Sequence, residues 1–399
     1  MIEDRRLLLV TGARWLSASR YALAARQAGF EVSLLGPRAH PVARLDWVDV
    51  VGEFSAFRLP ATLARILNET PFALLVPTDD LGFAIVVDAY RQGMLNDRAA
   101  HTVERSLGAP SSFGIRHSRI ELGGLAARTG LVAPVTIGLD GGNLDEALDA
   151  TGLPAVLKVD GGAGGQQVMI VQDADQAAAA YRVLARRPSI VNAVGRLVLD
   201  HDETYLAPAI ARSAPVVSVQ QFAPGEPANL AVASWQGEVL GQVGARAVRS
   251  QPGNGPATII EPFEHPDMTR AASVVARELG LSGLFGLDFV LAPDRSSAAL
   301  IELNPRATPT SPLLPPSVSR PLWHLLADAV GVDAPPPPPP LPAGPIALFP
   351  QLTEIHRDDA AAAAAHLDLP AAQDVVELCR NGSFREAPGV LERTIRRIF

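Results

Sequence analysis

The chain has 399 residues, 48% of them hydrophobic, and a formal net charge of -8. The length allows two or three domains with substantial cores. A mildly acidic balance gives no support for nucleic-acid binding, and the single cysteine, Cys379, excludes an intrachain disulfide. The first residues do not read as a secretory signal, and no apolar run is long enough to span a membrane, so we expect a cytoplasmic protein without membrane contacts.

The first hundred residues alternate between strand and helix patterns. Residues 7–10 form an apolar run typical of a buried strand, and residues 19–29 have the periodicity of a helix. Residues 31–35 predict a second strand, and residues 72–80 complete a third unit. The sequence therefore predicts a doubly wound α/β domain over residues 1–105, with ligands at the carboxyl ends of its strands.

Polar residues follow the first and third of these strands. The turn over residues 11–13 lacks the later glycines of a dinucleotide fingerprint, so we reject NAD binding. Arg14 follows that turn, and the carboxylates Asp79 and Asp80 follow the third strand. Arg14 and Asp79 are candidates for substrate contact, and loop capping explains them equally well.

One lysine stands among 34 basic residues, and the others are arginines. This residue, Lys158, lies at the end of a second apolar run and directly before a glycine-rich loop. A compact ammonium beside flexible backbone N–H donors suits a phosphate cradle, whereas the alternative is a solvated lysine before a glycine turn. A Walker A loop and a protein-kinase loop both place their glycines before the lysine, so the order here excludes them. The glycines are Gly161, Gly162, Gly164 and Gly165.

Two later strand patterns carry acids. Asp288 alternates with apolar neighbours in residues 285–290, and Glu302 and Asn304 lie two apart, hence on one face of a strand. Oxygen ligands of this kind suit Mg²⁺, or Mn²⁺ in its place, beside nucleotide phosphates. Arg306 follows at the mouth of the same strand, where its planar fork can clamp a phosphate or carboxylate. An isolated acid would be an ordinary solvent-facing residue, but here two acids share an otherwise apolar hairpin.

Taken in chain order, these features resemble the ATP-grasp superfamily over roughly residues 5–330. The stretch 246–258 looks most like ligases similar to the large subunit of carbamoyl-phosphate synthase. The resemblance implies a pre-ATP-grasp domain before an ATP-grasp module over residues 106–330. Within that module, it implies a lid over about 151–215 and a C-terminal lobe over about 216–330. A proline run over 335–340 predicts a stiff linker to a C-terminal α/β segment, residues 341–399.

The resemblance also implies roles for individual residues. Lys158 would bind the α and β phosphates of ATP, and the glycine loop would close over the β and γ phosphates. Asp288, Glu302 and Asn304 would hold one or two Mg²⁺ ions. The adenine hinge would be formed by Gln220, Gln221 and Phe222, with Glu226 near the ribose.

The chain departs from the family pattern at three places. Arg119 stands where the family commonly has a lysine in the helix before a Gly-x-x-x-Pro turn, although it could still bind a phosphate as a cation. Glu226 is followed by Pro227, which displaces the usual second acid and puts its ribose role in doubt. Residues 189–215 form a link longer than usual, for which the sequence gives no role.

The chemistry expected of this constellation is ATP-dependent joining of a small-molecule carboxylate to an amine. The acid would attack the γ phosphate to give an acyl phosphate and ADP, and the amine would then displace phosphate. Arg249 and Arg306 would offset charge on the transferring group, and Arg246 with Arg249 would hold the acid. A pair of surface arginines is the alternative for Arg246 and Arg249. The family often forms dimers, so a homodimer is a further expectation.

Three other functions remain open. The same site would serve a carboxylate kinase, or a carboxylase that works through carboxyphosphate. A nucleotide-binding protein without turnover is the second alternative. A pyridoxal-phosphate Schiff base on the single lysine is the third, but the glycine loop directly after Lys158 and the separate acid pair argue against it.

Overall fold

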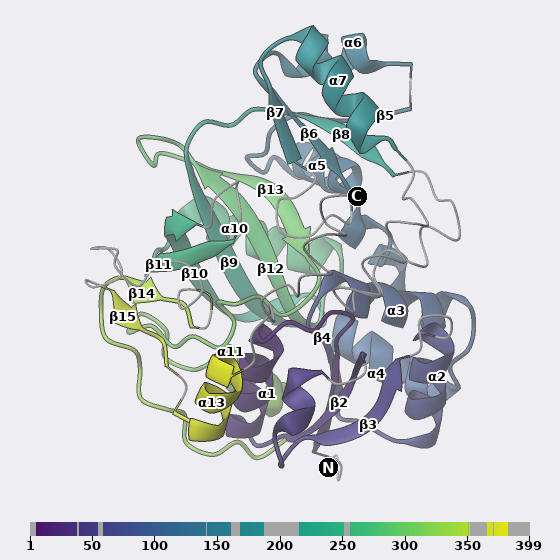
Figure 1. Ribbon diagram of the computed structural model, residues 1–399, viewed down its shortest axis with the longest axis vertical. Coiled ribbons are helices and arrows are strands. Elements are labelled where there is room, and N and C mark those ends of the chain that lie inside the picture. Colours follow the sequence, from purple (N-terminus) through teal and green to yellow (C-terminus); the bar gives the residue numbers. More distant parts are fainter. Residues whose placement is uncertain are drawn as a thin grey trace, which may run out of the picture.

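A computed structural model of the chain shows three sheets with helices packed on them (Figure 1). The residues described are 5–37, 40–54, 59–140, 142–160, 168–186, 215–250, 256–349, 351, 365–369 and 371–381.

The N-terminal unit is a parallel four-stranded sheet of order β3-β2-β1-β4 with helices on both faces. Leu7 and Leu9 of β1 pack with helix α1, whereas Leu8 and Val10 point the other way and pack with α2 and α3. This confirms the predicted doubly wound domain. The structure also adds strand β3, which the sequence did not predict because most of its residues are exposed or half-buried. The elements are β1 (Arg6–Val10), α1 (Ser17–Gln27), β2 (Glu31–Pro37), β3 (Asp49–Phe54), α2 (Leu59–Glu69), β4 (Leu74–Pro77), α3 (Asp80–Arg91) and α4 (Asp97–Leu107).

Helix α5 (Arg119–Thr129) leads into a smaller antiparallel unit that we call the lid. Its sheet has the order β5-β8-β6-β7, and two helices cover one face (Figure 1). Ala155, Leu157 and Val159 of β6 point into the core under these helices, so Val156 and Lys158 lie on the opposite face. The lid elements are β5 (Thr136–Leu139), α6 (Leu144–Thr151), β6 (Ala155–Val159), β7 (Val168–Val171), α7 (Ala174–Leu184) and β8 (Val217–Gln221).

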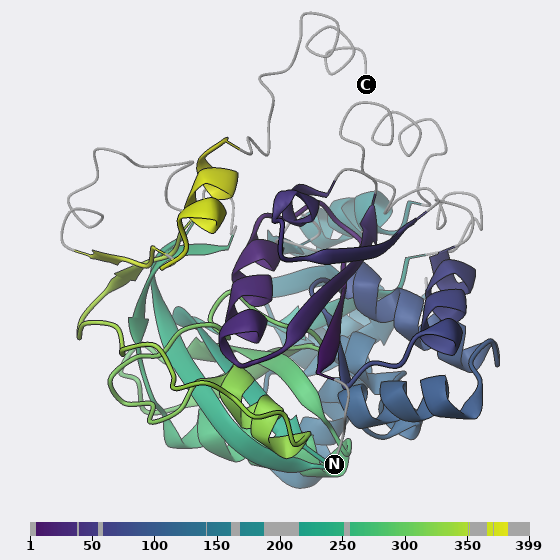
Figure 2. The same cartoon turned by 90° about the horizontal axis from the view of Figure 1, so that it is seen from below.

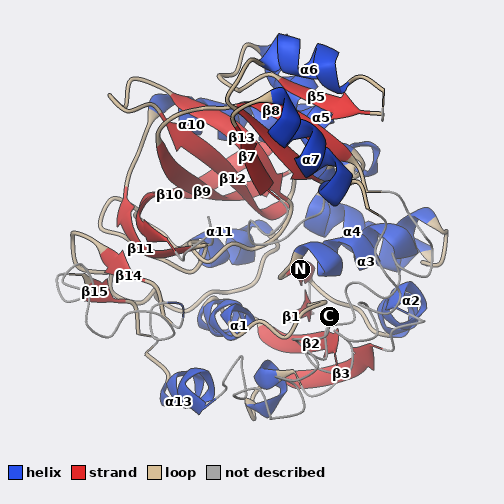
Figure 3. Ribbon diagram, turned by 45° about the horizontal axis from the view of Figure 1, so that its top comes forward, coloured by secondary structure: helices blue, strands red, loops and turns tan. Residues whose placement is uncertain are grey.

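A seven-stranded sheet of order β13-β12-β9-β10-β11-β14-β15 lies between the lid and the N-terminal sheet (Figure 3). Helices α5 and α10 pack on one face, and α1 and α11 belong to the core on the other. Leu287 and Phe289 of β12 join the α10 face, so Asp288 between them points to the other face. The elements are β9 (Glu226–Trp235), β10 (Glu238–Ser250), β11 (Ala257–Pro262), α10 (Pro266–Glu278), β12 (Gly283–Leu291), β13 (Ala298–Asn304) and α11 (Leu322–Ala329).

The segment after the proline run packs back on the rest of the chain. Its strands β14 (Ile346–Ala347) and β15 (His366–Leu367) extend the central sheet, and its helix α13 (Gln373–Asn381) lies against α1 (Figure 2). Arg20 of α1 donates to the Asp368 carboxylate at 2.5 Å and to its carbonyl at 2.6 Å. The buried sulfur of Cys379 lies 3.3 Å from the Ser19 hydroxyl. The C-terminal segment is thus tied to the helix that follows the first strand.

Candidate functional site

Lys158 lies on the lid face opposite to helices α6 and α7. Its ammonium donates to Gln220 Oε1 at 2.7 Å, and Gln220 in turn donates through Nε2 to Thr136 Oγ1 at 3.0 Å. The residue is only 7% exposed. Burial lowers its pKa to about 8, while the Glu302 and Asp288 carboxylates act in the opposite sense. The lid lysine therefore shares one electrostatic environment with the acid-bearing strands.

The predicted acids converge at one end of the central sheet. Asp288 and Glu302 are direct cross-strand partners in β12 and β13. Asp288 Oδ2 accepts from Asn304 Nδ2 at 2.8 Å, and Asp288 Oδ1 accepts from Asn229 Nδ2 at 2.6 Å. Asn229 was not identified from the sequence, because only the register of β9 against β12 places it opposite Asp288. The available signal was one amide in the mainly apolar middle of β9.

Arg119 connects the acid pair to the lid. From the first turn of α5, its Nη2 donates to Glu302 Oε1 at 2.5 Å, and its Nη1 donates to the Val159 carbonyl at 2.7 Å. Asp160 Oδ1 lies 3.4 Å from the same Nη1. Burial raises the pKa of Glu302, and the Arg119 charge opposes that shift. The residue that departs from the family pattern thus lies beside the acids and the lysine strand.

Arg306 joins the acid strand to the N-terminal unit. Its Nε donates to Asp80 Oδ1 at 3.0 Å, and its Nη2 donates to Asn304 Oδ1 at 3.2 Å. Burial opposes its charge, but the Asp80 carboxylate outweighs this and holds the pKa of Arg306 above its usual range. Asp80 also belongs to the electrostatic surroundings of Glu302. Of the two carboxylates after β4, Asp80 is therefore the one that adjoins the acid strand.

Asp79 has the geometry of a loop cap, which is one of the two explanations that the sequence allowed for it. Its Oδ1 accepts from the Gly82 N–H at 2.7 Å and caps α3, and its Oδ2 accepts from Thr11 Oγ1 and the Gly12 N–H, both at 2.8 Å. At 3% exposure, the carboxylate is committed to holding two strand-end loops together. Arg14 lies half-buried in the first of these loops, and a role for either residue in substrate contact stays a prediction.

Arg246 belongs to a second, more exposed cluster on the central sheet. It donates to Glu226 Oε2 at 3.4 Å and forms a short contact with Glu261, its cross-strand partner. Arg295 donates to both oxygens of Glu226 at 3.3 and 3.2 Å. Arg249 is exposed, next to an irregularity in the β10–β11 register. Arg246 and Glu226 are thus brought together by an ion pair, and their predicted roles with acid and ribose stay predictions.

The residues predicted to form the adenine hinge lie at the end of β8 and directly after it. Gln221 donates its N–H to the Val135 carbonyl at 2.8 Å and Phe222 is half-buried. Two residues not identified from the sequence, Val156 and Ile170, are cross-strand partners on the same lid face as Lys158. Ile170 is 45% exposed, so this face offers apolar surface beside the lysine. Lysine and apolar surface together suit a ligand with an anionic end and a flat apolar end.

Several predicted residues lie outside the described part of the chain. The glycine loop after the lysine and most of the long link over 189–215 belong to this group. The bend over 253–255, which follows Arg249, also falls outside it. The glycines concerned are Gly161, Gly162, Gly164 and Gly165.

The acid-bearing strands fit a divalent cation. Two carboxylates and one amide oxygen from Asp288, Glu302 and Asn304 are hard oxygen donors on neighbouring strands. Among the described residues no three His, Cys, Asp or Glu side chains are grouped for a metal, and this set combines two carboxylates with one amide. Such a partial set suits Mg²⁺, which keeps waters and phosphate oxygens as its remaining ligands.

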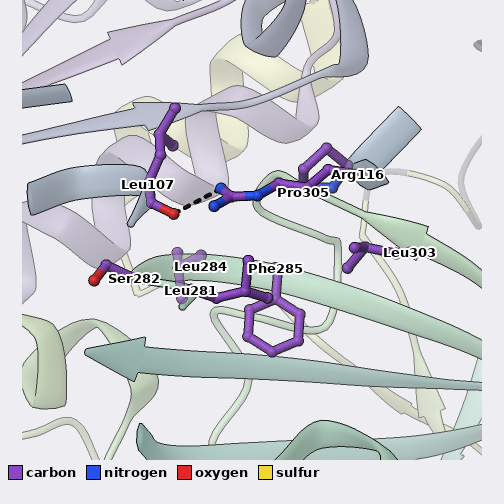
Figure 4. A pocket seen from close by; sticks show the side chains of 8 residues that line it. All are labelled: Leu107, Arg116, Leu281, Ser282, Leu284, Phe285, Leu303 and Pro305. Atoms are coloured by element: carbon purple, nitrogen blue, oxygen red, sulfur yellow. Dashed lines mark hydrogen bonds between the residues drawn. The ribbon is translucent and has the colours of Figure 1, made fainter. Parts of the chain in front are cut away.

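A pocket lies behind the acid strand, where the N-terminal unit meets the central sheet (Figure 4). Leu303 and Pro305, which alternate with the polar residues of that strand, form part of its wall. The buried Arg116 donates through Nη1 to the Leu107 carbonyl at the end of α4, at 2.6 Å. This contact fixes the turn from which α5 and Arg119 begin. The lining residues are Leu107, Arg116, Leu281, Ser282, Leu284, Phe285, Leu303 and Pro305.

No helix in the described part of the chain is both long and apolar enough to cross a membrane. No protein-family model matches the chain, and no curated protein matches its sequence.

Solved structures, in contrast, match over most of the length. A carboxyaminoimidazole ribonucleotide synthase from Aspergillus clavatus, complexed with ATP, superposes with a TM-score of 0.58 at 13% identity, covering 84% of this chain and 79% of the other. A phosphoribosylglycinamide synthetase from Anaerococcus prevotii gives 0.52 at 14%, covering 83% and 76%. An L-amino acid ligase from Bacillus licheniformis gives 0.50 at 14%, covering 76% and 68%. At this identity the likeness shows the fold alone: the chain shares its overall fold with this ligase and these synthases, which agrees with the fold class predicted from the sequence.

Proposed function

We propose that this protein is a cytoplasmic, ATP- and Mg²⁺-dependent ligase that joins a small-molecule carboxylate to an amine. The acid would be activated as an acyl phosphate with release of ADP. The amine would then displace phosphate, lose a proton and form a C–N bond. The neighbouring structures are named as ligases or synthetases of small molecules, one of them complexed with ATP, which supports this class of reaction.

The observation that carries the proposal is the convergence of lid and sheet on one charged site. Arg119 contacts both the Glu302 carboxylate and the carbonyl of Val159, the residue after Lys158. A lid ammonium on one side and two carboxylates on the other are the charges needed to hold a metal–triphosphate. Perturbed, buried titratable groups that converge in this way are typical of functional sites.

Each residue would act by position and charge. Lys158 would bind phosphate oxygens from the lid, and Asp288, Glu302 and Asn304 would hold the metal, which supplies charge neutralisation on the phosphates when bound. Val156 and Ile170 would contact the flat base on the same lid face. Closure of the lid would exclude water, because an acyl phosphate is otherwise hydrolysed.

Arg306 and Arg249 are our candidates for handling the acid. Arg306 lies at the mouth of the acid strand between Asn304 and Asp80, close to the site where charge would build up. Arg249 is exposed, and its fork suits a carboxylate. Arg246 is paired with the Glu226 and Glu261 carboxylates, and it remains our second candidate for holding the acid.

The test is an ADP-release screen with the complete chain, Mg²⁺ and ATP, in which pooled acids are combined with pooled amines. We expect ADP release that requires one acid pool and one amine pool together, with a new amide product by mass spectrometry. Lys158→Ala serves as the matched blank for contaminating ATPases. Release that needs an acid or bicarbonate but no amine would instead identify a carboxylate kinase or a carboxylase. Nucleotide binding without stimulated release would identify a binding protein.

A further inference from the structure

We propose that Arg119 is a positioning residue that holds the place of the metal. In the nucleotide-free chain its guanidinium would occupy the Glu302 carboxylate and join it to the lid strand. It would give up that carboxylate when nucleotide and metal bind, and turn to the phosphates. This inference rests on the proposed function, because it assumes that Glu302 is a metal ligand.

The contacts of Arg119 point in this direction. The side chain is 8% exposed, and its two terminal nitrogens have different partners: Nη2 binds Glu302 Oε1, and Nη1 binds the Val159 carbonyl. Glu302 lies on the central sheet and Val159 lies on the lid, 143 residues earlier in the chain than Glu302 by their numbers. One guanidinium thus spans the two surfaces between which the nucleotide would lie.

An arginine suits this task and a lysine would not. The planar fork donates to its two partners from two separate nitrogens, whereas a lysine would have to reach both acceptors with the three donors of a single nitrogen. The backbone of Arg119 is also held in place, because its N–H donates to Asp160 Oδ1 at 3.3 Å. The family's usual lysine at this place would contact phosphate but would not tie the lid to Glu302 in this way.

One donor of the guanidinium is still unsatisfied. Arg119 Nε is buried and has no hydrogen-bond partner among the described residues. A buried N–H without an acceptor is costly, so the present arrangement leaves binding capacity for another acceptor. Phosphate oxygens are such acceptors, and a planar guanidinium binds them well. The side chain therefore has a reason to hold Glu302 in one state and a reason to leave it in another.

The proposal predicts opposite effects of one substitution on two ligands. Arg119 and a metal ion are both cationic and share the Glu302 oxygen, so they compete. Removing the guanidinium should therefore strengthen the binding of a metal ion in the absence of nucleotide. The same substitution should weaken the binding of metal-free nucleotide, because the phosphates lose a cationic partner. A purely structural strut would not give effects of opposite sign.

The experiment measures Mn²⁺ alone by electron paramagnetic resonance and metal-free ADP by calorimetry, with the complete chain. For Arg119→Gln we expect Mn²⁺ to bind about tenfold more tightly and ADP about tenfold more weakly than for the wild type. Arg65→Gln is the control, since Arg65 pairs with Glu69 at 2.9 Å on an exposed face of α2 and should change neither affinity. Thermal melting of all variants reports whether the fold is kept.

Arg119→Lys keeps the charge but loses the fork, and it covers the case in which the glutamine variant does not fold. We expect it to bind Mn²⁺ at least about twofold more tightly than the wild type, because one ammonium cannot hold Glu302 and Val159 together. Unchanged or weaker Mn²⁺ binding in a folded Arg119 variant overturns the proposal. If the wild-type chain binds neither Mn²⁺ nor ADP, the proposed function itself fails, and this inference falls with it.

Discussion

Two arginine–carboxylate clusters lie on the central sheet, and they differ in burial. In the first, Arg119 is 8% exposed beside Glu302, and Lys158 at 7% adds a second cation nearby. In the second, Arg246 pairs with Glu226, whose side chain is 39% exposed, and Arg295, at 42%, pairs with the same acid. From the sequence alone Arg119 and Arg246 were both candidates for the site.

This difference in burial indicates which of the two clusters is the better candidate for a functional site. Exposed ion pairs are screened by water and contribute about 0–1 kcal/mol, so the Arg246 cluster has an ordinary structural explanation. In the other cluster, burial raises the pKa of Glu302 and lowers that of Lys158, so both groups are charged at a cost that a bound ligand would offset. Comparing equivalent substitutions in the two clusters tests this distinction directly.

The largest effect is expected for Lys158→Ala. Removing the ammonium from the lid should reduce turnover by at least about 10³-fold and weaken nucleotide binding, because the phosphates lose their buried cation. The fold should be kept, since among the described residues the side chain of Lys158 gives up one hydrogen bond, to Gln220. ADP release and thermal melting measure the two quantities. Wild-type turnover in this variant would remove the basis for the phosphate cradle.

A somewhat smaller loss is expected for Glu302→Gln. The substitution removes a charged ligand but keeps the shape, so we expect a rate lower by about 10²–10³-fold and a higher Mg²⁺ concentration for half-maximal rate. Glu261→Gln, in the Arg246 cluster, is the matched control and should leave both values within about twofold. Titration of the rate with Mg²⁺ checks the pair. Equal behaviour of the two variants would mean that the comparison between clusters is wrong.

The lowered pKa of Lys158 predicts a pH dependence of nucleotide binding. Below pH 7 the ammonium is charged, and above its pKa of about 8 it loses its proton. Affinity for metal-free ADP should therefore be constant at low pH and fall by up to about tenfold per pH unit above 8. Lys158→Arg, which stays protonated, should flatten this profile in calorimetry. An unchanged slope in that variant would assign the pH dependence to another group.

The lowered pKa of Lys158 also predicts how the stability of the folded chain changes with pH. The ordinary pKa of lysine is 10.5, so between about pH 8 and 10.5 the unfolded chain binds a proton at Lys158 that the folded chain does not. Stability should therefore rise with pH over this window, and the contribution should be absent in Lys158→Met. Chemical denaturation at several pH values compares the two chains.

The smallest effects distinguish the two arginines of β10. Arg249→Ala should raise the KM for the acid by about tenfold and leave the KM for ATP nearly unchanged, since a bidentate carboxylate contact is lost. Arg246→Ala should change both KM values by less than about twofold, because that residue is paired with Glu226 and Glu261. Steady-state kinetics with the substrate found in the screen measures both. If Arg246→Ala alone raises the KM for the acid, the second cluster is the substrate clamp.

Local sequence pattern was sufficient to predict much of the fold and the strand face on which several candidate site residues lie. Short apolar runs between helix patterns predicted the N-terminal sheet, and a spacing of two placed Glu302 and Asn304 on one face of a strand. The apolar run before Lys158 predicted the strand that the structure has as β6. These features depend on neighbours within a few residues, which is the range over which backbone periodicity fixes the direction of a side chain.

What only the tertiary structure decided is the partner of each charged group. Arg306 and Asp80 are 226 residues apart, Arg119 and Glu302 are 183 apart, and Asn229 meets Asp288 through strand register. A guanidinium fork has the same donors in every sequence context, so its partners depend on which strands and loops the fold brings within hydrogen-bond distance. For this reason the sequence indicated Arg119, Arg246 and Arg306 only as candidates. The packing of the lid, the central sheet and the N-terminal unit then determined which groups each of them contacts.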